Sequence, residues 1–167
     1  TTSSLNFTPV IMSKNAFFAK LNREMPVIWI YYGLMIVMAL YNLLIFLSIR
    51  DKSYIYYVLF IISYIVLQMS LNGYAFQYLW PESIWWANNS LPFFIMITLF
   101  FVGVFLVSTV ETGQRFPVLN KILIFMLIIP SLILSILSLV ISYSIAIKLA
   151  TVSIAVGAII WYASVIF

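Results

Sequence analysis

The sequence contains no histidine and no cysteine. It therefore lacks the main ligands of zinc, haem and iron–sulfur centres, and it can form neither a disulfide nor a Ser–His catalytic pair. Charged residues make up only 7% of the chain, and the four acids, Glu24, Asp51, Glu82 and Glu111, stand at the ends of apolar runs or between them. No two of them are placed for general acid–base chemistry, and no glycine-rich phosphate loop occurs. We therefore expect neither enzyme activity nor a cofactor in this chain.

Hydrophobic residues, by contrast, make up 65% of the 167 residues, and the mean hydropathy is +1.17. Soluble domains are about half apolar and about a quarter charged, so a chain of this composition has too little polar surface to face water. The net charge of +4 comes from Lys and Arg residues scattered at the ends of the apolar runs. Because these residues do not gather on one face, we expect no nucleic-acid partner. The composition predicts an integral membrane protein whose surroundings are the lipid bilayer.

The apolar residues are gathered into five long runs. A helix that crosses the bilayer needs about 20 such residues, and the short connections between the runs require neighbouring helices to be antiparallel. We therefore expect an all-α, polytopic transmembrane bundle with about five spanning helices, the first of which has Pro26 in its opening turn. The five runs are residues 26–49, 54–71, 91–110, 118–141 and 149–167.

Residues 1–25 are more polar than the rest, and Lys14, Lys20 and Arg23 alternate there with apolar side chains. We expect an extracytoplasmic juxtamembrane segment here, either a helix that lies in the headgroup region or a disordered tail. A transmembrane domain follows over residues 26–167. Because the chain starts with Thr1 and its last apolar run stops at Phe167, we expect this domain to be incomplete at its C-terminal end.

A few uncharged polar residues interrupt the apolar runs, where lipid offers no hydrogen-bond partner. Asn42 and Gln68 are expected either to form hydrogen bonds between helices or to belong to a ligand site or conformational switch. Pro130 is expected to kink the fourth helix, as a hinge or as a fixed bend. The serines that follow it recur at spacings of four, three and four, which predicts a close helix–helix contact, with a water-lined polar track as the alternative. This serine stripe comprises Ser131, Ser135, Ser138 and Ser142.

The connection between the second and third runs is rich in aromatic residues. Trp and Tyr collect at the membrane–water interface because their rings are amphipathic, which is one interpretation of this composition. The other is an aromatic ligand-binding surface on the extracytoplasmic side, and the sequence alone does not separate the two. The aromatic residues concerned are Tyr74, Phe76, Tyr78, Trp80, Trp85 and Trp86.

Two stretches carry a recognisable order of residues. In residues 32–57, a Tyr41-Asn42 pair is followed by the turn Arg50-Asp51-Lys52 and then by several tyrosines, and residues 72–81 read Asn-Gly-Tyr-Ala-Phe-Gln-Tyr-Leu-Trp-Pro. This pattern resembles the opening of the bacterial seven-transmembrane receptors with diverse intracellular signalling modules. The resemblance covers about residues 25–120, and the last two helices match only in being hydrophobic.

The resemblance implies a seven-helix membrane region between an extracytoplasmic sensory domain and a cytoplasmic signalling module, such as a histidine kinase, a cyclase or a phosphatase. On this basis we expect the transmembrane part of a bacterial sensory receptor that relays a signal between the two. A fragment of a membrane transporter or channel is the alternative. Whether the protein forms a homodimer is left open.

The orientation in the membrane does not follow from charge. The eight Lys and Arg residues divide evenly between the two sides of the predicted bundle, so the excess of positive charge that marks cytoplasmic loops is missing. The resemblance implies the bacterial inner membrane with the N-terminus outside the cytoplasm, which would place Arg50 inside.

Overall fold

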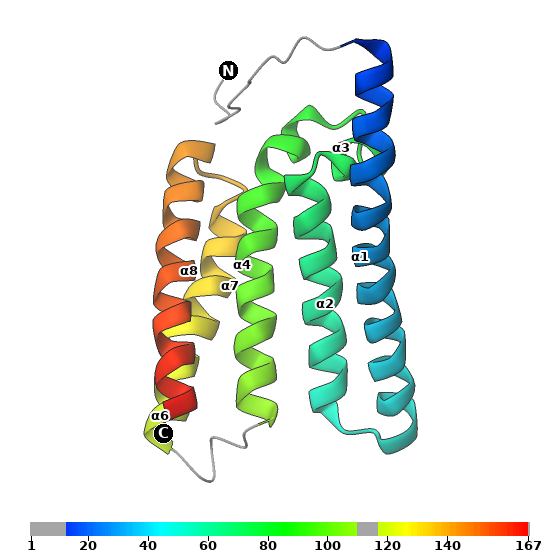
Figure 1. Ribbon diagram of the computed structural model, residues 1–167. Helices are drawn as coiled ribbons and strands as arrows, with labels where there is room; N and C mark the ends of the chain where they lie inside the picture. The colour runs from blue at the N-terminus through cyan, green and yellow to red at the C-terminus, as the bar shows by residue number, and fades with distance from the viewer. Residues whose placement is uncertain (1–12, 110–116, 167) are drawn as a thin grey trace.

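The computed structural model describes residues 13–109 and 117–166, and helices are the only regular elements in these two ranges. The long helices stand side by side, with neighbours antiparallel (Figure 1). Four of the described helices are long and apolar enough to cross a membrane, and α8 adds a further apolar helix. The predicted all-α bundle is thus confirmed. The elements are α1 (Lys14–Ile49), α2 (Lys52–Leu71), α3 (Tyr74–Tyr78), α4 (Ile84–Thr109), α6 (Pro117–Leu123), the π-helix η1 (Ile124–Ile128), α7 (Ile129–Leu137) and α8 (Tyr143–Ile166).

The first helix is longer than the sequence predicted, since α1 begins at Lys14 and Pro26 lies in its interior. Most residues that precede Pro26 are strong helix formers, which lets the helix extend through this position. The basic stretch from Lys14 to Arg23 therefore continues the first spanning helix and is neither a tail nor a separate helix in the headgroup region. Residues 1–12 lie outside the described ranges, and the domain boundary at residue 25 stays a prediction.

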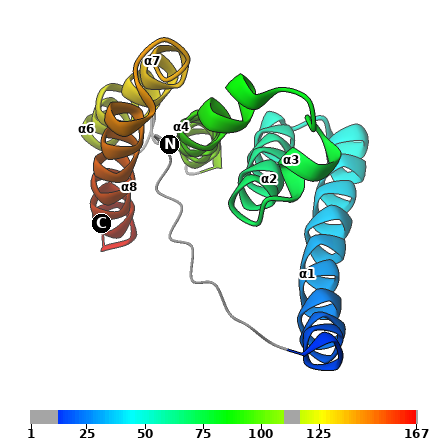
Figure 2. The same ribbon diagram turned by 90° about the horizontal axis from the view of Figure 1, so that it is seen from above.

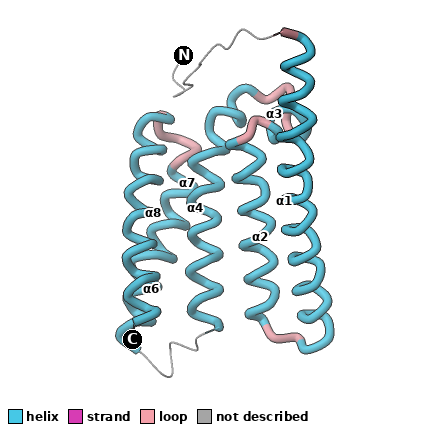
Figure 3. The backbone as a smooth tube through the Cα atoms, in the orientation of Figure 1, coloured by secondary structure: helices cyan, strands magenta, loops and turns pink. Residues whose placement is uncertain are grey.

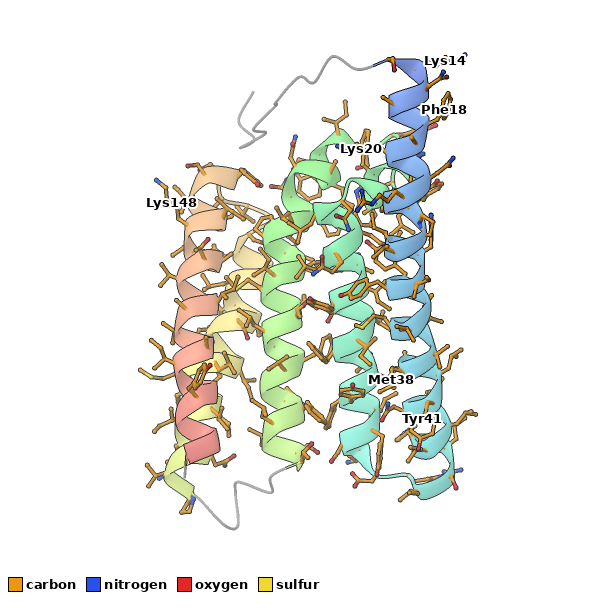
Figure 4. The ribbon with its side chains drawn as sticks, in the orientation of Figure 1. Lys14, Phe18, Lys20, Met38, Tyr41 and Lys148 are labelled. Carbon is orange, nitrogen blue, oxygen red and sulfur yellow. The ribbon has the colours of Figure 1, made fainter. Side chains whose placement is uncertain are left out.

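The 36 residues of α1 rise about 1.5 Å each, which gives a length of about 54 Å. The hydrocarbon core of a bilayer is only about 30 Å thick. The first turns of α1 accordingly project beyond the other helices (Figure 1), and Figure 4 shows Lys14 and Phe18 on this projecting part.

The turn between α1 and α2 is tight because two residues end one helix and start the next. Arg50 adopts the left-handed conformation, with φ of 60°, and its N–H donates to the carbonyl of Phe46. Asp51 then caps α2, since its carboxylate accepts the N–H of Ser53 at 2.9 Å. A left-handed residue at a helix end and an aspartate at a helix start are both favoured capping arrangements.

Two other helices also begin earlier than their apolar runs. α4 begins at Ile84 rather than at residue 91, and α8 begins at Tyr143 rather than at residue 149. In α4 the polar residues of the first turns are accommodated by their own helix, because Asn89 donates to the carbonyl of Trp85 and Ser90 to that of Ala87. An apolar run marks the part of a helix suited to lipid, whereas the helix itself can extend into more polar sequence.

Viewed along the helix axes, the long helices form a curved row rather than a closed ring (Figure 2). α2 packs against both α1 and α4, and α4 is covered on its other side by α7, η1 and α8. On that side, Leu123 and Leu127 are buried against Leu99, Leu106 and Val107. The described loops are short and lie at the two ends of the bundle (Figure 3). The central position of α4 makes it the element through which the two halves of the row contact each other.

Candidate functional site

Residues from the first resembling stretch gather around one cavity at the Arg50 end of the bundle. The cavity has a volume of about 480 Å³ and lies among α1, the α1–α2 turn, α2 and α4. Figure 4 shows Met38 and Tyr41 in this half of α1. Residues that form an ordered pattern along the chain therefore also form a unit in space. Those shared by the pattern and the cavity include Tyr41, Asn42, Asp51, Tyr54 and Tyr57.

α4 closes the cavity through contacts with α2. The hydroxyl groups of Ser53 and Ser108 lie 2.8 Å apart and form a hydrogen bond between the two helices. Nearby, the rings of Tyr57 and Phe105 pack with their centroids 5.2 Å apart and their planes tilted by 49°. The cavity thus has a polar and an aromatic contact that tie α2 to α4.

Asn42 lies on the cavity wall and is only partly buried. Its amide donates to the carbonyl of Met38 at 2.8 Å, within its own helix. A hydrogen bond to a neighbouring helix was one of the two predictions, and in the described part of the chain the bond is made inside α1 instead. The carbonyl four residues earlier is always within reach of such a side chain, so the helix can satisfy the amide without a second helix. The alternative role of Asn42, in a switch or ligand site, stays a prediction.

Gln68 also bonds within its own helix, since its amide donates to the hydroxyl of Tyr64 at 2.9 Å. Tyr64 in turn lies beside Tyr31 of α1. A direct polar contact between α1 and α2 is formed one turn further on, where the amide of Asn72 donates to the hydroxyl of Tyr32 at 3.0 Å. The sequence reasoning missed this pair, although both residues lie in stretches that carry the resemblance. The signal was Asn72 at the end of an apolar run, where a polar group caps the helix or binds a neighbour.

The aromatic connection is divided into two packed clusters. In the first, Tyr74 of α3 packs against α1, with ring centroids 5.8 Å from Trp29 and 6.4 Å from Tyr32. The Tyr74 hydroxyl also donates to the sulfur of Met25 at 3.1 Å. This cluster fixes the short helix α3 against the extended first helix.

The second cluster holds the following loop against the start of α4. Trp80 stacks on Phe94, with centroids 6.1 Å apart and an interplanar angle of 3°, and its ring meets Trp86 edge to face at 6.0 Å. Phe76, Tyr78 and Trp85 remain 45%, 58% and 58% exposed, respectively. Part of the predicted aromatic surface is therefore used for packing, and only the exposed part is left for lipid headgroups or a ligand.

Three members of the serine stripe are buried: Ser131 and Ser135 on α7, which packs mainly against α4, and Ser138 directly after its last residue. Each hydroxyl donates to the carbonyl three residues earlier, at 3.0, 2.7 and 2.7 Å, so none needs a partner on another helix. Ser142 does not continue the stripe, because it lies in the connection between α7 and α8 and is exposed. The chain leaves the helix through tighter bonds, in which the N–H of residues 139 and 140 donate to carbonyls three residues back.

Pro130 is the second residue of α7, two positions after the last residue of the π-helix, and the predicted kink at this position stays a prediction. Proline has no N–H and its ring crowds the carbonyl four residues earlier, so a regular α-helix is disfavoured there. The N–H of Ile129 donates instead to the carbonyl of Ile124, five residues back, which widens the turn.

Glycines on two neighbouring helices face this widened turn. A Cβ atom added at Gly103 of α4 would lie 2.8 Å from Cγ1 of Ile128, and one added at Gly157 of α8 would lie 3.2 Å from Cδ1 of Leu127. The three helices therefore approach closely at η1 because two of them lack a side chain there.

A second cavity, of about 430 Å³, lies at the opposite end of the bundle between the starts of α4 and α8. Its walls include Trp85 and Ser142, two predicted residues that are far apart in the sequence, together with Asn88, Asn89 and Tyr143. No group of three or more His, Cys, Asp or Glu residues that could hold a metal ion occurs in residues 13–109 and 117–166.

These features define an integral membrane protein of the polytopic α-helical class. Residues 24–167 match the family described as 7TM diverse intracellular signalling, so the chain belongs to this family of receptor transmembrane regions. The match includes the cavity, both aromatic clusters and the π-helix. No curated protein and no solved structure matches the chain.

Proposed function

We propose that this chain is the transmembrane relay of a bacterial sensory receptor, which passes a conformational change from an extracytoplasmic sensory domain to a cytoplasmic signalling module. The observation that carries the proposal is the family match over residues 24–167. In this proposal the protein lies in the inner membrane, its N-terminus is outside the cytoplasm, and the Arg50 turn is inside. The catalytic step belongs to the signalling module and not to this chain.

The π-helix is the element best suited to carry the change. A π-helical turn holds one more residue than the α-helical turn it replaces, so converting η1 to an α-helix would turn one flanking segment by about 100° and move it about 1.5 Å along the axis. Gly103 of α4 and Gly157 of α8 lie close to side chains of η1, so such a rotation would change the packing of η1 against both helices. Because α4 also packs against α2, the motion would reach the cavity at the Arg50 end.

The alternative of a transporter or channel has less support. Such proteins use paired broken helices or polar groups at the middle of the membrane. Here the charged residues of the described helices stand towards helix ends or on the projecting part of α1, and the π-helix is an interruption in one helix.

The orientation can be tested by labelling single cysteines with a membrane-impermeant thiol reagent in intact cells. Lys52→Cys and Ser83→Cys suit this purpose because both positions are exposed and the chain has no cysteine of its own. Ser83→Cys should react in intact cells, and Lys52→Cys only after lysis. Labelling of Lys52→Cys in intact cells would overturn the assignment of the Arg50 turn to the cytoplasm.

The relay itself can be tested in the full-length receptor by comparing two Gly→Ala variants. Gly103→Ala disturbs the contact with η1, whereas Gly33→Ala on α1 meets no atom within 4 Å. We expect Gly103→Ala to change the basal output of the signalling module at unchanged protein level and Gly33→Ala to leave it unchanged. Equal output from both variants would refute a relay through η1, and solute uptake by proteoliposomes of the purified protein would refute the receptor assignment in favour of transport.

A further inference from the structure

The wall of the cavity at the Arg50 end of the bundle carries a negative charge. Among the described residues that line it, Asp51 is the one that carries a charge; the residue is exposed, and its carboxylate accepts the N–H of Ser53. The basic residues on either side of it, Arg50 and Lys52, are also exposed but do not line the cavity. The cavity wall therefore carries one negative charge, and the two basic residues next to Asp51 in the sequence lie outside the wall.

Aromatic rings supply much of the remaining wall. Tyr41 comes from α1, Tyr54 and Tyr57 from α2, and Phe105 from α4. The face of an aromatic ring attracts a cation electrostatically, and several rings around one carboxylate form the kind of site that holds an organic ammonium group. A purely apolar ligand would leave the charge of Asp51 uncompensated, and an anion would be repelled by it.

The size of the cavity fits such a ligand. Its volume of about 480 Å³ lies within the range of about 300–1,000 Å³ found for small-molecule sites. It is at the end of the bundle beside the charged turn at Arg50, which suits a position at the lipid headgroups. A ligand whose ammonium group is joined to a phosphate would also suit Arg50 and Lys52, which flank Asp51 in the sequence and are exposed.

We infer that the cavity among Tyr41, Asp51, Tyr54, Tyr57 and Phe105 binds an ammonium group, supplied either by the headgroup of an aminophospholipid or by a soluble primary amine. The ammonium group lies against the Asp51 carboxylate and the tyrosine rings. Because its walls come from α1, α2 and α4, a bound ligand holds these three helices together. This site does not depend on the direction of signalling or on the orientation of the chain in the membrane.

The test uses the purified chain in nanodiscs that contain phosphatidylethanolamine or phosphatidylglycerol, with the bound lipid measured by native mass spectrometry. A separate titration with ethanolamine covers the soluble source. Two variants remove one negative charge each: Asp51→Asn in the cavity and Glu82→Gln at an exposed site in the loop before α4. Asparagine caps a helix as well as aspartate does, so Asp51→Asn keeps the start of α2. Tyr41→Leu removes one ring at a position that is 59% exposed and so leaves the packing intact.

We expect phosphatidylethanolamine to be retained in preference to phosphatidylglycerol, with affinity lowered about fivefold by Asp51→Asn and about threefold by Tyr41→Leu. Glu82→Gln should bind as the unchanged chain does. Saturable binding of ethanolamine without retention of phosphatidylethanolamine would assign the site to a soluble amine. Equal retention of the two lipids without ethanolamine binding, or equal effects of Asp51→Asn and Glu82→Gln, would overturn the proposal.

Discussion

Replacing Gly103 by alanine tests how closely α4 and η1 are packed. The added Cβ would lie 2.8 Å from Cγ1 of Ile128 and 3.2 Å from Cδ2 of Leu127, and both neighbours belong to the π-helix. Leu127 is only 4% exposed, so it has little room to move away. Overpacking of this kind costs about 1–3 kcal/mol, whereas exchanging glycine for alanine in a helix gains about 1 kcal/mol. The gain is common to every glycine-to-alanine change in a helix, so we expect Gly103→Ala to be about 1–3 kcal/mol less stable than such a change in open space.

Gly33→Ala on α1 provides that reference, because nothing lies within 4 Å of its added Cβ. Gly157→Ala should fall between the two, since its Cβ would meet a terminal methyl of Leu127 at 3.2 Å, and such a methyl can shift by a few tenths of an ångström. Reversible unfolding of the purified protein in mixed micelles, followed by circular dichroism, gives the three free energies of unfolding.

A double variant separates the steric contact from other effects of the alanine. Ile128→Ala removes the atom that the new Cβ would meet, so Gly103→Ala should cost about 1 kcal/mol less in that background than in the unchanged chain. If Gly103→Ala is as stable as Gly33→Ala, the close approach of α4 to η1 is refuted. If the cost is the same with and without the Ile128 side chain, this contact is not its cause.

Three further predictions concern hydrogen bonds. A double-mutant cycle of Ser53→Ala and Ser108→Ala should give a coupling of about 0.6 kcal/mol in the same unfolding assay, as is typical of such bonds in membranes, and zero coupling would contradict the bond between α2 and α4. Asn72→Ala and Tyr32→Phe should each destabilise the protein by about 0.5–1.5 kcal/mol, with the double variant no worse than the more harmful single one, because both remove the same bond; additive losses would show two separate effects. Asn42→Leu should change the free energy of unfolding by less than about 0.5 kcal/mol, because among the described residues its amide bonds within its own helix; a loss above about 1.5 kcal/mol would show a partner on another helix.

The class of fold was predictable because lipid constrains a sequence more simply than water does. A spanning segment has to satisfy its backbone internally and present apolar side chains, so the apolar runs directly indicated the helices. The ends of the helices were predicted less well. α1, α4 and α8 all begin before their apolar runs. The first turns of α1 contain basic residues and those of α4 contain Asn89 and Ser90, so a helix can extend into sequence that is less apolar than its membrane-spanning part.

The candidate site was predictable in its residues but not in their contacts. Asn42 and the tyrosines after the Arg50 turn were singled out by their order, yet their position around one cavity depends on how α1, α2 and α4 pack. Ser108 of α4 could not be connected to Ser53 because 54 residues separate them along the chain and nothing in the sequence shows that α2 and α4 are neighbours. The π-helix was also missed, since Pro130 signals only that the regular hydrogen-bond pattern fails and not how the chain restores it.

The uninterrupted length of α1 has a mechanical consequence. A rod of about 54 Å that tilts by about 10° moves one end by about 9 Å relative to the other, whereas the same tilt moves a segment only as long as the bilayer core by about 5 Å. About 18 Å of α1 precede Pro26, so this additional displacement arises outside the apolar part of the helix. α1 therefore acts as a lever arm. A small change in the tilt of α1 among the packed helices moves Lys14 by several ångströms. Conversely, a force applied at Lys14 exerts a torque on the bundle.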